Sequence, residues 1–369
     1  MKRSVQGLKK KCAFDCIYCF THEDYETKGQ SKLNKEELQN VELIQPFCDY
    51  DVFACENNDW EREISEYSQY GKIISYATKS YISEEKAKVL SEINNKLMKV
   101  GAFMHVGVSI TTINFLEEIE QMASSYEKRV ESIKNLNNFS IPCSVIIKPL
   151  LPVLTLEELK RIIDDTSDYC DNFVYGPLYL NTKIKKYLEN KGILVVCKRH
   201  KASWMKEKPE REIFDLKQMA DIVCFLKNYC SEVGKTAFES NDDAVEDIRR
   251  KIMENDVLEL KNLINNCYGD LKIRSSAMLI DDLGKRYYGV AIGIKIKKLG
   301  MTCISNVICN AVTEGARKFE RLLVYIESTD IEKKNELLDE ETLRLLKEFK
   351  IMKYKLIFSD GKISDEYLE

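Results

Sequence analysis

Three cysteines near the N-terminus carry the clearest chemical signal in the sequence. Cys12, Cys16 and Cys19 follow a C-x3-C-x2-C spacing, directly after a short β-like run. A compact loop with this spacing can turn three thiolates toward one centre, and soft thiolates suit zinc or an iron–sulfur cluster. No fourth ligand is obvious nearby, so a metal held here would keep one open position, which is typical of a reactive site.

Two other interpretations of the triplet remain open. Cysteine makes up 13 of the 369 residues, so this spacing is expected by accident roughly 1–2% of the time. A zinc site completed by His22, three residues after Cys19, is the stronger alternative.

Short β-like runs alternate with amphipathic helices before and after the triplet. The expected strands are rich in Val, Ile or aromatic residues, as buried parallel strands are. They cover residues 4–8, 50–55, 72–78, 105–111, 143–148 and 172–175. Helices are expected at 83–98, 124–139 and 155–168, the last two opening on capping boxes, Ser124 with Glu127 and Thr155 with Glu158. This pattern predicts an α/β fold with a parallel barrel or partial barrel, whose chemistry lies at the C-terminal ends of the strands.

The cysteine loop, with the aromatic Tyr18 before its third cysteine, resembles the cluster motif of the radical S-adenosylmethionine (SAM) superfamily. The resemblance implies a partial parallel (β/α)6 barrel of the radical SAM type, which agrees with the number of expected strands. It also implies a [4Fe-4S] cluster held by Cys12, Cys16 and Cys19, with SAM on the fourth iron and Tyr18 at the cofactor. One electron, from a donor such as flavodoxin or ferredoxin, would cleave SAM reductively. The resulting 5′-deoxyadenosyl radical would abstract hydrogen from a substrate.

Further segments extend this resemblance over most of the first 200 residues, in the manner of the spore photoproduct lyase-like branch. They are residues 77–80, 106–112, Glu120 with 124–129, 146–152 and 176–178. By position, the resemblance implies that Lys79, Ser109 and Arg129 contact the polar end of SAM, whose carboxylate needs cationic or hydroxyl partners. Glu56 stands where the superfamily often has Gly-Gly-Glu. In the superfamily this motif holds the amino group of SAM. The sequence here is Ala-Cys-Glu-Asn, so Asp59 and Glu61 remain alternatives to Glu56 for that role.

Residues 275–327 resemble the cytidine deaminase fold, through an opening hairpin at 277–290 and a helix end at 311–319. The deaminase Cys-Ala-Glu triplet falls on Thr302, Cys303 and Ile304, and no Pro-Cys-x-x-Cys pair follows. A zinc deaminase needs three metal ligands and a carboxylate. We therefore expect a pseudo-deaminase domain over 251–369, used for substrate binding, as a lid or for homo-oligomerisation. An unrelated small α/β domain is the alternative.

A basic stretch separates the two predicted domains, 1–200 and 251–369. Residues 181–211 hold ten Lys or Arg against three Glu, a local net of +7 in a chain of −4. The stretch runs into an expected basic and helical connector over 201–250. It is either a phosphate-contacting surface, with Tyr187, His200 and Trp204 to stack on bases, or a solvated helix and linker.

Composition limits the remaining classes. The net charge of −4 excludes a broadly basic nucleic-acid binder, so such contacts would need a local patch. No apolar run reaches the roughly 18 residues of a membrane span, and no signal peptide is evident. We expect no membrane partner and a reducing cytoplasm, where closely spaced cysteines bind metal or do redox chemistry.

Together these features predict a radical SAM enzyme that acts on a nucleoside, nucleotide or nucleic acid. They leave open whether it is a lyase, an oxidoreductase or a transferase. One alternative is radical modification of a peptide or small metabolite. Another is a non-catalytic binding protein that carries a metal or a cluster.

Overall fold

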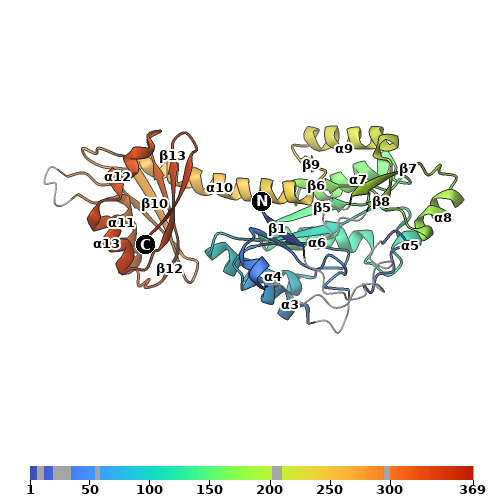
Figure 1. Ribbon diagram of the computed structural model, residues 1–369, viewed down its shortest axis with the longest axis horizontal. Coiled ribbons are helices and arrows are strands. Elements are labelled where there is room, and N and C mark those ends of the chain that lie inside the picture. Colours follow the sequence, from blue (N-terminus) through green and yellow to red (C-terminus); the bar gives the residue numbers. More distant parts are fainter. Residues whose placement is uncertain (6–11, 20–34, 55–58, 202–209, 295–299, 369) are drawn as a thin grey trace. The chain divides into compact units, whose positions relative to one another are not determined.

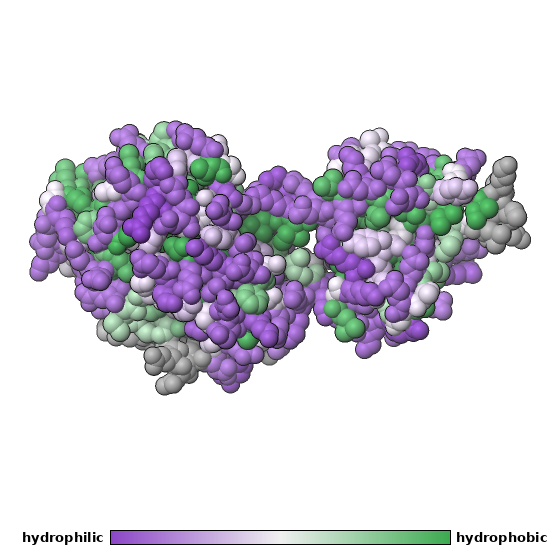
Figure 2. All heavy atoms as spheres, turned by 180° about the vertical axis from the view of Figure 1, so that it is seen from behind, coloured by the Kyte–Doolittle hydropathy of each residue, from purple (hydrophilic) through white to green (hydrophobic). Residues whose placement is uncertain are grey.

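A computed structural model describes residues 1–5, 12–19, 35–54, 59–201, 210–294 and 300–368 (Figure 1). The chain divides into two compact units. Unit 1 is Met1–Leu97 with Ala102–Ile248, and unit 2 is Met98–Gly101 with Arg249–Glu369. On the face drawn in Figure 2, hydrophilic side chains predominate over both units and hydrophobic ones gather in small groups. None of the helices in the described part of the chain has the length and apolar character needed to cross a membrane.

Unit 1 is built on a seven-stranded sheet in which every pairing is parallel. Its strands in spatial order are β1 (Arg3–Val5), β2 (Leu43–Gln45), β3 (Ile73–Thr78), β4 (Met104–Ser109), β5 (Cys143–Ile147), β6 (Asn172–Tyr175) and β9 (Thr236–Phe238). The expected α/β fold with a parallel sheet is confirmed. The sheet also gains β9, a strand that the sequence analysis did not anticipate.

The second predicted strand was wrong. Residues 50–54 form turns, and the strand that pairs with β1 and β3 is Leu43–Gln45. The carboxylate of Asp51, inside the predicted strand, instead accepts hydrogen bonds from the backbone N–H of Phe53 (3.0 Å) and of Lys79 (2.7 Å). A buried carboxylate that collects backbone donors fixes a turn, which apolar patterning alone does not reveal.

Helices follow the strands, and two of their start signals illustrate how the sequence specifies them. Thr155 and Glu158 form the predicted capping box of α7 (Leu156–Thr166). The cap of α6 (Tyr126–Asn138) is Ser125, whose side chain accepts from Lys128 N, one residue beyond the predicted Ser124. The other helices up to residue 190 are α2 (Lys35–Gln39), α3 (Trp60–Ser68), α4 (Glu84–Lys99), α5 (Leu116–Ile119) and α8 (Thr182–Asn190).

Residues 210–248 belong to unit 1. They form β8 (Glu210–Phe214), which pairs with β7 (Cys197–Lys201), then η2 (Leu216–Met219), α9 (Ala220–Glu232), β9 and the start of α10 (Asn241–Leu263). Helix α9 packs against β9 and α7. This part of the chain was expected to be a connector over 201–250, and the structure differs because β9 pairs with β6.

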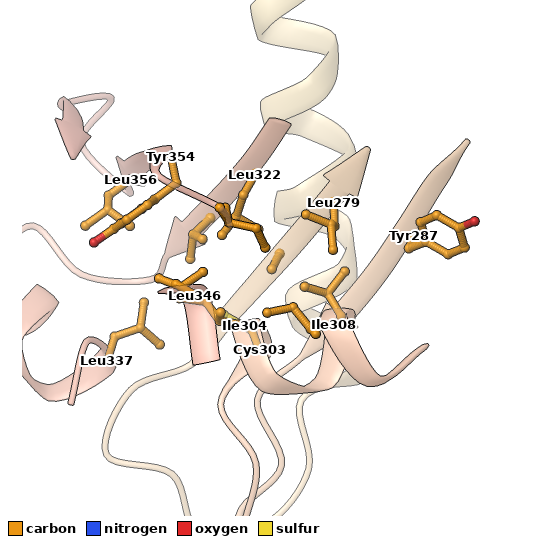
Figure 3. Packing of buried hydrophobic residues seen from close by; sticks show 14 of the residues in the cluster. Leu279, Tyr287, Cys303, Ile304, Ile308, Leu322, Leu337, Leu346, Tyr354 and Leu356 are labelled. Atoms are coloured by element: carbon orange, nitrogen blue, oxygen red, sulfur yellow. The ribbon is translucent and has the colours of Figure 1, made fainter. Parts of the chain in front are cut away.

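Unit 2 has a mixed five-stranded sheet. Its strands in spatial order are β11 (Arg286–Val290), β10 (Ser275–Asp281), β12 (Phe319–Ile326), β13 (Lys353–Phe358) and β14 (Ile363–Tyr367). The remaining elements are η3 (Ile264–Asn266), α11 (Cys303–Thr313), η5 (Ile331–Lys333), α12 (Lys334–Leu337) and α13 (Glu340–Glu348). Side chains of the sheet and α11, among them Leu279, Leu322 and Ile308, meet in one apolar core (Figure 3).

Candidate functional site

The cysteine loop follows β1 and is tied to two other parts of unit 1. Ile17 N donates to Ile119 O (3.0 Å), and Asn181 Nδ2 donates to the carbonyls of Ile17 (3.0 Å) and Cys19 (3.3 Å). The same Asn181 caps α8, accepting from Ile184 N. The loop backbone is therefore fixed by hydrogen bonds within the protein.

One face of the parallel sheet carries a polar row. Ser75 Oγ lies 2.8 Å from His105 Nδ1, and His105 Nε2 lies 2.8 Å from Ser144 Oγ. All three residues are buried, and desolvation by burial lowers the pKa of His105 to about 4. Because side chains alternate along strands, residues two and four positions further along β3 and β4 face the same side.

The same face of the sheet, which we call the inner face, is exposed to solvent at one point above the polar row. Ala77, two residues after Ser75, is exposed although it sits inside β3. Gly107 occupies the matching position of β4, and a Cβ there would lie 2.6 Å from the side chain of Ile146. Lys79 and Ser109 come two residues later on each strand, so both of these predicted cofactor residues belong to this face.

Glu120 lies at the centre of a buried hydrogen-bonded network. Its carboxylate accepts from the hydroxyl of Tyr18 in the cysteine loop, and from Thr111 Oγ1 at 2.7 Å. Arg129 Nη1 lies 2.5 Å from Glu120 Oε2, both side chains being 0% exposed. Lys79 Nζ lies 4.0 Å from Glu120 Oε1 and 5.7 Å from the centre of the Tyr18 ring. Glu120 thus links β3, the exit of β4, α6 and the cysteine loop.

The network keeps Glu120 charged. Burial alone would raise the pKa of this carboxyl, but the Lys79 and Arg129 cations outweigh it and the pKa lies below its usual value. Burial would likewise lower the pKa of Lys79, and Glu120 reverses that, so this pKa is raised. Burial, followed by the charge of Glu120, raises the pKa of Tyr18, which therefore stays a hydroxyl donor. The result is a fixed ion pair with a second cation beside it.

The thiols of the triplet are close enough to influence one another. Burial raises the pKa of Cys16 to about 12, while Lys79 acts to lower it and Cys12 and Cys19 act to raise it. Burial also raises the pKa of Cys12, opposed by backbone hydrogen bonds from Asp51 and Phe14. Thiols in this state become good ligands only beside a metal cation, which stabilises the thiolate.

The residues present fit an iron–sulfur cluster with SAM in two respects. Ser109 Oγ and Arg129 Nη2 are buried and have no hydrogen-bond partner in the described structure; such orphaned polar atoms call for a partner. Three thiols on one anchored loop are the donor set of a cluster. Within the described residues, no three His, Cys, Asp or Glu side chains are placed to hold a single metal ion; a cluster distributes its cysteines over different irons.

The predicted residues differ in how they relate to this site. Arg129 belongs to the Glu120 network and is fully buried, with Nη1 also donating to Ser109 O (2.9 Å) and Nε to Ser124 O (2.8 Å). Asp59 caps α3 and pairs with Arg62 (3.1 Å), and Glu61 is exposed. Glu56 and the alternative zinc ligand His22 lie outside the described residues.

Sequence reasoning missed three residues that organise the site. Glu120 was quoted only as part of a resemblance, and Asp51 and Asn181 were not singled out. Asp51 also accepts from Thr78 Oγ1 (2.8 Å), so it fixes the end of β3 from which Lys79 projects. Two acidic residues close together in an otherwise apolar run, Asp49 and Asp51, were the available signal.

Half of the ten cations in the basic stretch form ion pairs with described acids. Described partners lie within 4.0 Å for five of its cations: Lys183 with Asp15, Lys185 with Glu212, Lys191 with Glu118, Lys198 with Asp215 and Arg199 with Glu210. Two of the acids lie in β8, Glu118 lies in α5, and Asp15 and Asp215 lie in the cysteine loop and just after β8. Trp204 lies outside the described residues, and the pairing favours the solvated interpretation.

In unit 2, the positions aligned with deaminase chemistry are structural. Thr302 caps α11, accepting from Ser305 N, and Cys303 is buried in the apolar core (Figure 3). Cys309 is exposed on the same helix. Cys303 and Cys309 therefore do not form a ligand pair, in agreement with their sequence spacing.

Comparison with models of known families finds no match, and neither does comparison with curated protein sequences. Among solved structures, spore photoproduct lyase complexed with dinucleoside spore photoproduct is similar, at 11% identity and a TM-score of 0.45, covering 62% of this chain and 74% of that one. SuiB from Streptococcus suis bound to S-adenosylmethionine is similar at 10% identity and a TM-score of 0.44, covering 64% of this chain and 50% of that one. Cytidine deaminase from Burkholderia pseudomallei has 13% identity and a TM-score of 0.26, and the match covers 30% of this chain and 88% of that one.

Proposed function

We propose that this chain is a radical SAM enzyme. Cys12, Cys16 and Cys19 would hold a [4Fe-4S] cluster, which when bound supplies one electron for the reductive cleavage of SAM and so a 5′-deoxyadenosyl radical for hydrogen abstraction. A carrier such as flavodoxin or ferredoxin would deliver the electron. The observation that carries the proposal is the link from the cysteine loop, through Tyr18, to the buried Glu120 network at the C-terminal ends of parallel strands.

Each residue of the network has a distinct task in this proposal. Lys79 offers its ammonium, 19% exposed at the side chain, to the carboxylate of SAM. Ser109 offers a hydroxyl that has no partner among the described residues. Glu120 is a positioning residue, because it acts through Lys79 and Tyr18. Arg129 holds the backbone of Ser109 through Nη1, and its Nη2, which has no described partner, is left for the polar end of SAM.

For the substrate, we favour a nucleoside or nucleotide over a nucleic acid. The sequence resemblance of unit 2 to a nucleoside-binding fold supports this class. The ion pairs at five of the ten cations of the basic stretch weaken the argument for contact with a long phosphate backbone. In unit 2, the burial of Cys303 in the apolar core argues against zinc chemistry, and we assign this unit to substrate binding or assembly.

The test is an anaerobic assay of 5′-deoxyadenosine. The full-length chain is reconstituted with iron and sulfide, mixed with SAM and dithionite, and compared with Cys16→Ala and with Cys309→Ala, a cysteine exposed on unit 2. We expect product from the wild type and Cys309→Ala, and none from Cys16→Ala. A colourless protein with one zinc, no iron and no product would contradict the proposal and favour a metal-bearing binding protein. Screening nucleosides and nucleotides for increased turnover then tests the substrate class.

A further inference from the structure

Lys148, at the exit of β5, is a cation that the proposed chemistry does not use. In β5, Ser144 contacts His105 and Ile146 packs with Val174 and Ala244, so both face inward. Lys148 is two residues further on, and alternation places it on the same inner face. This is the face on which Ala77 is exposed and Lys79 and Ser109 lie.

The neighbouring strand makes room for this lysine. A Cβ built on Gly176, just after β6, would lie 2.6 Å from Cε, 2.8 Å from Cδ and 3.1 Å from Nζ of Lys148. Only a residue without a side chain leaves the space that the lysine occupies. The position of the ammonium is thus set by β5, which carries the lysine, and by the glycine that follows β6.

Among the described residues, the ammonium has no counter-ion. The side chain of Lys148 takes part in no described hydrogen bond and in no described ion pair at 4.0 Å or less. Two acids act to raise its pKa, Asp242 more than Glu239, and Asp242 is already bound to Arg3 and to Gln45 Nε2 (2.7 Å). Burial lowers the pKa of Lys148, and these charges do not restore it. A half-buried cation left unpaired on this face is suited to an incoming anion.

We infer that Lys148 binds the phosphate group of the substrate inside unit 1, in the space that Gly176 leaves beside it. The inference rests on the proposed function for the substrate class, and it narrows that class to a phosphorylated nucleoside. Lys79 and Ser109, at the ends of β3 and β4, serve the cofactor; Lys148, at the end of β5, serves the substrate.

The test measures binding of inorganic phosphate to the full-length chain by equilibrium dialysis, as purified and after reconstitution. Lys148→Met removes the charge and keeps the length of the side chain. Lys186→Met, at an exposed lysine of α8, is the matched control. We expect the wild type and the control to bind one phosphate with the same Kd, and Lys148→Met to raise that Kd at least tenfold.

Gly176→Ala gives a second, independent variant. The clash is with the flexible end of a lysine, so the chain can fold while the ammonium is displaced. We expect circular dichroism like that of the wild type and a Kd for phosphate raised severalfold. Unchanged Kd values in Lys148→Met and Gly176→Ala would overturn the inference.

Two further arms separate the possible anions. Acetate bound as tightly as phosphate would contradict a phosphate site, and stoichiometric displacement of phosphate by SAM would assign Lys148 to the cofactor carboxylate instead. Phosphate binding does not depend on radical chemistry, so a Lys148-dependent site without Cys16-dependent 5′-deoxyadenosine would defeat only the proposed function. Product without a phosphate site would defeat only this inference.

Discussion

At the scale of single residues, the Glu120–Arg129 pair is the most consequential contact of unit 1. Both side chains are fully buried, and removing one partner of such a pair leaves an uncompensated charge in the interior. We expect Glu120→Gln to lower the free energy of unfolding by about 3–5 kcal/mol and to reduce iron incorporation, because Tyr18 loses its anionic acceptor. Chemical denaturation and iron analysis measure the two effects.

The matched control is Glu131→Gln on α6. Glu131 pairs with Lys128 at 2.9 Å, with both side chains about half exposed, and exposed pairs add little stability. Equal losses in Glu120→Gln and Glu131→Gln would show that the buried network has no special role.

His105 should make the stability of unit 1 depend on pH. Its folded pKa is about 4, because burial disfavours the imidazolium, against about 6.5 in an unfolded chain. Between these values only the unfolded chain takes up the proton, so stability present above pH 6.5 falls as the pH drops toward 4. The full loss is about 3 kcal/mol.

The measurement compares the wild type with His105→Gln from pH 8 to pH 4. Glutamine offers a donor and an acceptor to Ser75 and Ser144 but does not titrate. We expect the variant to start less stable and to show a flatter decline. Parallel curves for the two proteins would exclude His105 as the cause.

The site residues that belong to short local motifs could be predicted from the sequence, but the residues that they contact could not. The cysteine spacing and the position of Lys79 are visible in short segments. The contact between Tyr18 and Glu120 joins positions 102 residues apart, and no local pattern encodes such a pair. The turn around Asp51 was predicted as a strand for the same reason, since its hydrogen bonds to Thr78 and Lys79 come from another strand.

At the scale of elements, Asn181 couples the start of α8 to the cysteine loop. Its Oδ1 accepts from Ile184 N at 2.9 Å, while its Nδ2 donates to the carbonyls of Ile17 and Cys19. Aspartate keeps the cap but sets a carboxylate against two carbonyl oxygens. We therefore expect Asn181→Asp to bind several times less iron on reconstitution, with α8 still formed.

Thr155→Ala is the control for a weakened helix start. It removes the cap of α7 and should cost about 1 kcal/mol without touching the loop. Iron content is measured per folded chain for both variants. A normal iron content in Asn181→Asp would mean that the loop holds its shape without this residue.

At the scale of the whole molecule, we expect the two units to respond separately to mutation. A Cβ at Gly289 in β11 would lie 2.4 Å from Val307 N and 2.6 Å from Cys303 O, both backbone atoms of α11. Gly289→Ala should therefore loosen unit 2 and increase its amide hydrogen exchange, with unit 1 unchanged. Gly315→Ala, which has φ of +96° and open space around it, should have a smaller effect of about 1 kcal/mol. Equal exchange increases in both units would show that they unfold together.

The division of the chain was only partly predictable. Strand patterns predicted most of the parallel sheet, and a family resemblance predicted a second α/β domain, but the first unit was expected to end near residue 200. Strand β9 has three residues and is partly exposed, so its own pattern is weak. Its place in the sheet comes from pairing with β6, which a sequence pattern does not contain.

The hydrogen bonds of the cysteine loop bear on how the protein matures. Ile17 and Asn181 fix the loop through bonds to protein atoms alone, so the thiols are held in place by folding itself. Inserting iron and sulfide would then require little rearrangement of the chain. We therefore expect a newly made chain to fold, and to become resistant to proteases, before iron and sulfide are inserted.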